Sequence, residues 1–168
     1  MGILRFVTPD AVVDTVDQIS AAWLTRWGVR GLVLDLDNTL VPWNTADVSV
    51  SVGVWVENLA AAGIASCVLT NNYTRRATEV ADLLKIPIIK AAFKPSPAAF
   101  RGALRVMSLP AAQVAVVGDQ LFTDVLGGKL AGMRAILVEP LSAREFFTTK
   151  FVRWLERPVR ARVAPRRT

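Results

Sequence analysis

The chain has 168 residues, a usual size for one domain, and 52% of them are hydrophobic, which excludes a disordered chain. It contains no histidine, which excludes a Ser-His-Asp triad, histidine acid–base catalysis and histidine-bound zinc. Without histidine, any proton transfer must use other groups. The single cysteine, Cys67, excludes an internal disulfide.

The net charge of +6 lies at the end of the chain. Residues 1–143 contain 12 basic and 12 acidic residues, whereas residues 144–168 contain eight basic residues against two acidic ones. We therefore expect a neutral globular domain over 1–143 and a cationic extension over 144–168. Such an extension favours a polyanionic partner, either a membrane surface or nucleic acid.

Predicted helices and strands alternate along the chain. Thr8-Pro9-Asp10 has the pattern of a helix start, and one or two short helices are expected to continue to about Trp27. Apolar, β-branched runs predict strands over 31–36, 64–69, 88–89, 114–118 and 134–138. Helical patterns lie between them, over about 49–62, 74–84, 96–109 and 121–131.

This alternation predicts an α/β fold: a three-layer, doubly wound, Rossmann-like parallel sheet of about five strands with helices on both faces. In such folds ligands bind beyond the carboxyl ends of the strands. Polar residues that directly follow a predicted strand are therefore the candidate functional residues.

Two acidic residues follow the first of these strands. Asp35 and Asp37 are two positions apart, so an extended backbone points both carboxylates to the same side. Two converging carboxylates repel each other unless a cation neutralises them, and carboxylate oxygens are preferred ligands of Mg²⁺. By itself, this pair fits an ordinary solvated turn equally well.

Polar residues also follow the next three strands. The hydroxyl, amides and backbone N–H groups of Thr70-Asn71-Asn72 can bind a phosphate before a helix, or simply cap that helix. Lys94 can balance a phosphoryl charge, or be a surface lysine. Asp119 ends a strand, and Asp124 can cap the next helix or orient a metal-bound water. Because all four features fall at one edge of the predicted sheet, together they favour a site that binds phosphate and a cation.

These motifs resemble the haloacid dehalogenase (HAD) phosphohydrolase superfamily, in particular its YqeG-type, subclass IIIA branch. The matching segments are DLDNTLVPW (35–43), VLTNN (68–72), KAAFKP (90–95) and VVGDQLFTDVLGG (116–128). The same branch is similar to the phosphatidylglycerophosphate phosphatases of mitochondria and plastids. The resemblance implies an HAD-type fold and a phosphoric monoester hydrolase.

The resemblance also implies a role for each motif residue. Asp35 would attack phosphorus and become an aspartyl phosphate. Asp37 would protonate the leaving alkoxide and then activate water. Thr70, Asn71 and Lys94 would bind the transferring phosphoryl group, with Asn71 acting through its backbone.

Mg²⁺ is the cofactor that the resemblance implies. Asp35, the main-chain carbonyl of Asp37 and the carboxylate of Asp119 would be its ligands, and Asp124 would support the metal's water shell. This scheme needs no histidine, in agreement with the composition.

Larger members of the superfamily cover the site with a cap domain. Here only about ten residues, Leu40 to Ser49, separate the first strand from the next helix, too few for a domain. We therefore expect a minimal cap or none, and an open site that suits a lipid head group or a macromolecular phosphate. Ala-Ala-Phe precedes Lys94 where a basic residue is common in relatives, which leaves the substrate contacts there open.

The cationic extension contains aromatic residues at helical spacing. Phe147, Phe151, Trp154 and Leu155 fall on one helical face among arginines and a lysine. This pattern fits peripheral binding to an anionic membrane, and packing of the aromatics on the globular domain equally well. Nucleic acid is a less favoured partner, because no recognised nucleic-acid-binding motif accompanies the charge.

The function expected from the sequence is Mg²⁺-dependent hydrolysis of a phosphomonoester, with phosphatidylglycerophosphate as the leading substrate. The enzymatic alternative is a phosphatase for a soluble nucleotide, sugar phosphate or phosphoprotein. The non-enzymatic alternative is a non-catalytic RNA- or ribosome-associated module. Without a recognisable signal peptide or an apolar run of about 18 residues, we expect a cytoplasmic protein, with peripheral binding at the inner face of the membrane. The sequence does not give the oligomeric state.

Overall fold

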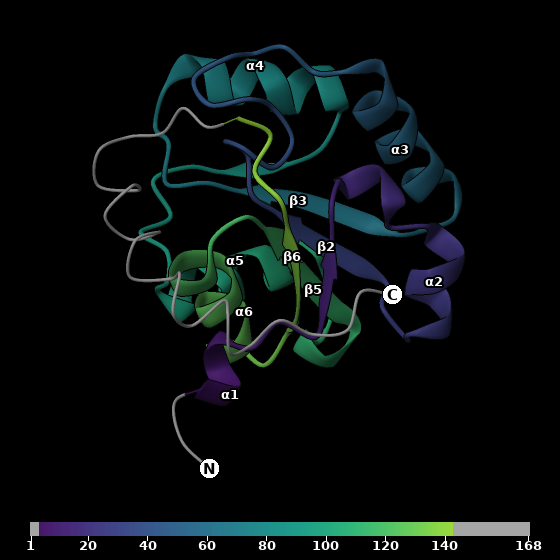
Figure 1. Cartoon of the computed structure of the whole chain (residues 1–168), viewed down its shortest axis with the longest axis vertical. Helices are drawn as coiled ribbons and strands as arrows, with labels where there is room; N and C mark the ends of the chain where they lie inside the picture. The colour runs from purple at the N-terminus through teal and green to yellow at the C-terminus, as the bar shows by residue number, and fades with distance from the viewer. Residues whose placement is uncertain (1–3, 143–168) are drawn as a thin grey trace.

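Six parallel strands form a single sheet in the computed structural model, which describes residues 4–142 (Figure 1). The strand order is β1-β6-β5-β2-β3-β4. The strands are β1 (Ala11–Val13), β2 (Gly31–Leu34), β3 (Ala65–Leu69), β4 (Ile88–Ile89), β5 (Val114–Gly118) and β6 (Arg134–Val138). The predicted doubly wound parallel sheet is confirmed, with one strand more than expected.

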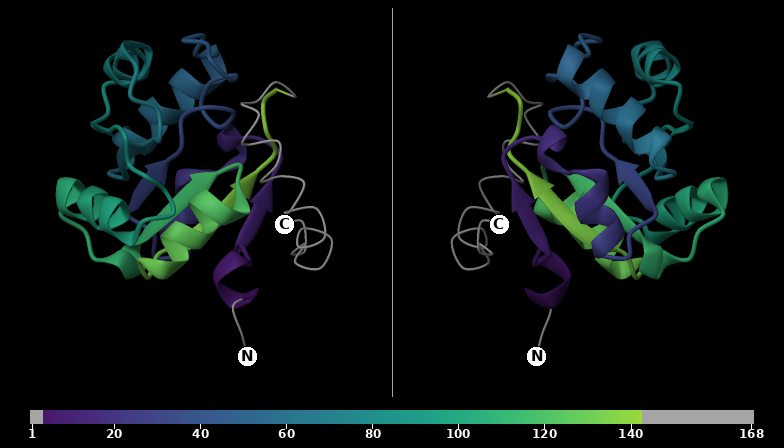
Figure 2. Two further views of the ribbon diagram at one scale, coloured as in Figure 1. Left: turned by 90° about the vertical axis from the view of Figure 1, so that its left-hand side faces the viewer. Right: turned by 90° about the vertical axis from the view of Figure 1, so that its right-hand side faces the viewer.

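Helices cover both faces of this sheet (Figures 1 and 2). One face packs against α2 (Ala21–Arg26), α3 (Val50–Ala61) and α4 (Arg75–Leu84), and the other against α5 (Pro97–Met107) and α6 (Leu126–Leu130). Side chains alternate between the two cores: Leu32 and Leu34 of β2 join the first, whereas Val33 joins the second. Burial on both faces explains the continuous apolar runs that identify these strands in the sequence.

The prediction of a helix beginning at Thr8-Pro9-Asp10 was wrong. A short helix, α1 (Leu4–Val7), ends before this point, and β1 then pairs in parallel with β6 at the edge of the sheet. The Asp10 carboxylate accepts a hydrogen bond from the Ala135 backbone N–H at 2.7 Å, and the Asp10 N–H donates to the Ala135 carbonyl at 2.7 Å. This segment therefore joins the sheet through backbone pairing with β6. The Thr-Pro-Asp pattern gives no sign of that pairing.

The other expected elements are present with small shifts in their ends. The strand predicted over 31–36 ends at Leu34, and Asp35 follows it with its N–H still bonded to the Val117 carbonyl at 2.9 Å. The helix predicted over 121–131 begins as a π-helical turn, Leu121–Val125, before α6. Two 3-10 turns, Val16–Gln18 and Ala111–Gln113, complete the described chain.

Within residues 4–142, no helix combines the length and apolar character needed to cross a membrane. The cationic extension and its predicted aromatic face lie outside the described residues.

Candidate active site

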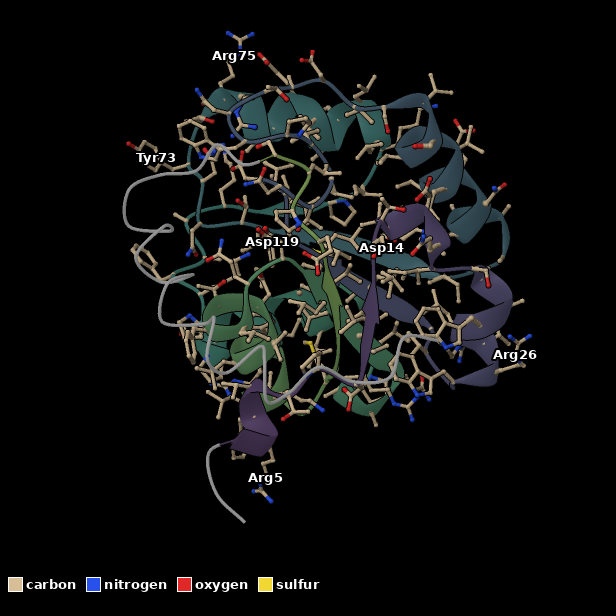
Figure 3. All side chains as sticks on the ribbon, in the orientation of Figure 1. Arg5, Asp14, Arg26, Tyr73, Arg75 and Asp119 are labelled. Carbon is tan, nitrogen blue, oxygen red and sulfur yellow. The ribbon has the colours of Figure 1, made fainter. Side chains whose placement is uncertain are left out.

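The candidate residues come from neighbouring strands. β2 lies between β5 and β3, so Asp35 after β2, Thr70 after β3 and Asp119 after β5 lie beyond adjacent carboxyl ends of the sheet. Figure 3 shows Asp119 near the centre of the molecule, whereas the exposed Tyr73 and Arg75 lie at its edge. The fold thus brings together residues that are far apart in the sequence.

Three buried carboxylates form the centre of the site. One oxygen from each of Asp35, Asp119 and Asp124 lies within 4.8 Å of the other two. Burying several like charges so close together is costly without a cation, and oxygen donors suit Mg²⁺. Asp124, expected to act through the metal's water shell, is therefore close enough to Asp35 and Asp119 to share a cation with them.

Lys94 neutralises part of this charge. Its ammonium lies 2.5 Å from an oxygen of Asp35 and 2.6 Å from an oxygen of Asp124, and all three side chains are almost fully buried. Three carboxylates and one ammonium leave a formal charge of −2, which one divalent cation would cancel. The donor set and its charge thus fit Mg²⁺.

The buried charges perturb one another. Burial raises the pKa of Asp35 to about 7, and the nearby Asp124 adds to the rise although Lys94 opposes it. Burial alone would lower the pKa of Lys94, but the carboxylates of Asp124 and Asp35 more than offset this and raise it above its usual value. Lys94 is therefore a permanent cation in the site, whereas Asp35 is poised between its protonated and ionised forms.

A glycine makes room for Asp124. A Cβ atom at Gly118 would overlap the Asp124 carboxylate, so only glycine at the end of β5 allows this approach. The other oxygen of Asp124 accepts a hydrogen bond from the Gln120 N–H at 3.3 Å. The strand end and the π-helical turn that follows it thus place Asp124 against the cluster.

The predicted phosphate-binding residues lie beside Lys94. The buried Thr70 accepts a hydrogen bond from the Asn72 N–H at 3.1 Å through its hydroxyl oxygen, which leaves the hydroxyl proton to donate. The Asn71 side chain accepts a hydrogen bond from the Lys94 N–H at 2.7 Å, and the Ala92 N–H donates to the Thr70 carbonyl at 3.1 Å. The loop before Lys94 is therefore fixed against the loop after β3.

Asp37 has a different set of partners from Asp35. Its Oδ1 accepts hydrogen bonds from Arg76 Nη2 at 2.7 Å and from the Asn44 N–H at 3.1 Å, and its Oδ2 accepts one from Asn72 Nδ2 at 3.1 Å. Sequence reasoning missed Arg76, and it assigned the Asn72 amide to phosphate binding rather than to contact with Asp37. The only signal for either was their position within or just after the Thr70-Asn71-Asn72 motif.

Comparisons with known proteins show the family to which the chain belongs. A family model described as "HAD-hyrolase-like" matches residues 92–140. The chain is 38% identical to "Probable phosphatase YqeG" of Bacillus subtilis (strain 168), across 92% of this chain and 90% of that protein. It is 26% identical to "Phosphatidylglycerophosphate phosphatase 1, chloroplastic/mitochondrial" of Arabidopsis thaliana, across 90% of this chain but only 47% of that protein.

Solved structures share the fold at low sequence identity. A hypothetical protein from Xanthomonas campestris has a TM-score of 0.57 at 20% identity, over 75% of this chain and 72% of that one. The cobalt-bound deoxy-D-mannose-octulosonate 8-phosphate phosphatase of Haemophilus influenzae has a TM-score of 0.56 at 14% identity, over 82% of this chain and 91% of that one. The 38% identity across nearly the whole of both chains shows that this protein is a phosphohydrolase of the HAD type. The chain belongs to the YqeG-type HAD phosphatases, enzymes that hydrolyse phosphoric monoesters.

Proposed function

We propose that the protein is a Mg²⁺-dependent phosphomonoesterase in which Asp35 is the nucleophile. The observation that carries this proposal is the buried group of Asp35, Asp119 and Asp124 around Lys94. Asp35, Asp119 and the main-chain carbonyl of Asp37 would hold the metal, with Asp124 beside them. When bound, Mg²⁺ would supply positive charge to the phosphoryl oxygens.

The chain's own residues would perform the transfer in two steps. An Asp35 oxygen bonds to phosphorus while the ester P–O bond breaks, and Asp37 gives its proton to the leaving alkoxide. A water molecule then attacks the aspartyl phosphate and gives a proton to Asp37, which releases inorganic phosphate and restores the Asp35 carboxylate. Lys94 and the Thr70 hydroxyl would hold the phosphoryl group throughout.

Replacement of the nucleophile tests this scheme. We expect Asp35→Asn to lose phosphatase activity and to form no acid-stable phosphoprotein from a ³²P-labelled ester. The control is Asp82→Asn, on the exposed face of α4, which should keep both properties. Phosphoprotein formation by Asp35→Asn would reject Asp35 as the nucleophile.

For the substrate we propose phosphatidylglycerophosphate presented at a membrane. Two exposed aromatic side chains support this choice: Tyr73 and Phe93 are each 79% exposed. Both flank the loops that hold the phosphate-binding residues, because Tyr73 follows Asn72 and Phe93 precedes Lys94. Aromatic rings favour the boundary between head groups and acyl chains, so these two could face lipid while the head group enters the site.

The similarity to the Arabidopsis phosphatase and the short linker after β2 also support a lipid substrate. The basic residues of 144–168, outside the described chain, would add attraction to an anionic surface. The similarity to a probable phosphatase argues against a non-catalytic RNA- or ribosome-associated module.

A substrate panel decides between lipid and soluble substrates. We expect the full chain to hydrolyse phosphatidylglycerophosphate in anionic vesicles faster than soluble sugar phosphates and nucleotides. Equal or slower turnover of the lipid would reject the lipid substrate and leave a phosphatase for soluble esters.

Replacement of Tyr73 and Phe93 tests whether they contribute to lipid turnover. Combined Tyr73→Ser and Phe93→Ser should reduce turnover of lipid in vesicles while leaving p-nitrophenyl phosphate hydrolysis unchanged. Leu83→Ser, an exposed apolar residue near the end of α4, is the matched control and should change neither activity. Unchanged lipid turnover in the double variant would show that Tyr73 and Phe93 do not contact the membrane.

A further inference from the structure

We propose that Arg76 is a positioning residue that fixes the Asp37 carboxylate for proton transfer. This inference rests on the proposed function, in which Asp37 carries the proton. It concerns a residue to which the sequence motifs assign no role.

Arg76 connects three parts of the fold. It lies in the first turn of α4, its Nη2 is 2.7 Å from Asp37 Oδ1 after β2, and its Nη1 is 2.5 Å from the Thr45 carbonyl in the linker that follows. The side chains of Arg76 and Asp37 are only 15% and 22% exposed, so solvent screens this ion pair less than a surface pair. A planar guanidinium that binds two groups at once restricts the direction of both bonds.

The hydrogen bonds distinguish the two oxygens of Asp37. A carboxylate oxygen offers two lone-pair sites. In the described chain Oδ1 accepts from Arg76 Nη2 and the Asn44 N–H, which fills both sites, whereas Oδ2 accepts from Asn72 Nδ2. Oδ2 is therefore the oxygen with room for a proton and for contact with a leaving group. Because Arg76 binds Oδ1, it fixes the rotation of the Asp37 carboxylate. This rotation leaves Oδ2 available for the proton and the leaving group.

The nucleophile does not depend on this arrangement. Asp35 is held by Lys94 at 2.5 Å and by the Thr39 hydroxyl at 3.5 Å, whereas Arg76 binds Asp37 and the Thr45 carbonyl. Loss of Arg76 should therefore impair proton transfer by Asp37 and spare phosphate binding and attack by Asp35. The effect of Arg76 on proton transfer can therefore be measured apart from attack by Asp35.

The experiment compares two phosphate esters that differ in their leaving group. p-Nitrophenolate leaves without being protonated, whereas the alkoxide of an alkyl phosphate such as glycerol 3-phosphate needs a proton from Asp37. The ratio kcat/KM reports the steps up to release of the alcohol. We expect Arg76→Gln to lower kcat/KM by roughly 10- to 100-fold for the alkyl phosphate and by less than about threefold for p-nitrophenyl phosphate.

Three further variants calibrate this result. Asp37→Asn should show the same selective loss in a larger degree. Arg76→Lys should recover part of the activity, because an ammonium keeps the charge but cannot hold Asp37 and the Thr45 carbonyl in one plane. Arg75→Gln is the matched control: the Arg75 side chain is 93% exposed and pairs with Glu79 at 3.1 Å, so neither ester should be affected.

Equal losses on both esters would overturn the proposal, since they would mean that Arg76 binds phosphate or supports the fold. Unchanged kcat/KM on both esters would overturn it as well. A double-mutant cycle tests the contact without using activity: the stability lost on combining Arg76→Gln with Asp37→Asn should be smaller than the sum of the two single losses. Additive losses would reject the contact, whether or not the enzyme hydrolyses either ester. The proposed function fails separately, if the wild-type enzyme hydrolyses no phosphomonoester, the lipid included.

Discussion

The ammonium of Lys94 lies 2.5 Å from the carboxylate of Asp35 inside the protein, although 59 positions separate the two residues in the chain. The same ammonium contacts Asp124, so a single lysine binds two of the three clustered carboxylates. Lys94 therefore makes the cluster less attractive to a cation, and under the proposed function it would also supply a positive charge for a phosphoryl group.

These two effects predict opposite consequences for Lys94→Met. Without the ammonium the carboxylates repel each other more strongly, so Mg²⁺ should bind roughly 10-fold more tightly or better. Phosphatase activity should nevertheless fall by about 100-fold, because the phosphoryl group loses a buried cation. Isothermal titration with Mg²⁺ and hydrolysis of p-nitrophenyl phosphate measure the two effects. Lys90→Met, at an exposed lysine whose Nζ contacts Thr78, is the control. Weaker Mg²⁺ binding by Lys94→Met would contradict this explanation.

A methyl group at Gly118 should displace Asp124. Because the new Cβ would overlap the Asp124 carboxylate, Gly118→Ala should weaken Mg²⁺ binding and destabilise the fold by about 1–3 kcal/mol. Gly53→Ala is the matched control in α3, where a Cβ would have no neighbour within 4 Å, and it should raise stability by about 0.5–1 kcal/mol. Denaturant unfolding and Mg²⁺ titration measure both variants. Unchanged Mg²⁺ affinity in Gly118→Ala would show that Asp124 has no part in the metal site.

The raised pKa of Asp35 predicts how Mg²⁺ binding depends on pH. With a pKa of about 7, Asp35 is mostly protonated at pH 6 and mostly ionised at pH 8. Protons and Mg²⁺ compete for this carboxylate, so the metal affinity should rise as pH increases through 7. The increase in melting temperature caused by Mg²⁺ should be larger at pH 8 than at pH 6. Asp35→Asn should lose most of this difference, and an equal effect of Mg²⁺ at both pH values would refute the competition.

Cys67 should be unreactive in the folded protein. It is buried in β3, and burial raises the pKa of its thiol to about 11, so little thiolate exists at pH 8. A thiol reagent such as dithionitrobenzoate should label no cysteine in the native protein and one after unfolding. Rapid labelling of the native protein would show that this part of the sheet opens readily.

The sequence predicts the interior strands well because each is buried on both faces. Leu32 to Leu34 and Val114 to Val117 are continuous apolar runs, and the polar residues that end them fall at one edge of a parallel sheet. The three-residue strand β1 is too short to show any periodicity, and its pairing with β6 depends on residues more than 120 positions away. Local patterns therefore favoured a helix there.

The candidate site, like the fold, could be predicted from the sequence only in part. The fold brings Asp35, Lys94, Asp119 and Asp124 together, as their positions after successive strands predicted. Their roles in metal binding and catalysis remain predictions. The contact of Arg76 with Asp37 could not be predicted, because it joins residues 39 positions apart through a long side chain on a helix. Asn72 and Asn44 complete that arrangement through equally non-local contacts.

The order of the strands also affects which parts of the protein can open. The sheet ends on its shortest strands, β1 with three residues and β4 with two, whereas β2 and β5 have neighbours on both sides. Hydrogen bonds at the margins of a sheet break in local openings that leave the centre intact. Asp35 and Asp119 extend from central strands, so fraying at either margin leaves the backbone beneath both carboxylates in place. Asp35 and Asp119 should therefore keep their relative position until the whole domain unfolds, whereas Lys94, which follows the marginal strand β4, should be displaced when that margin opens.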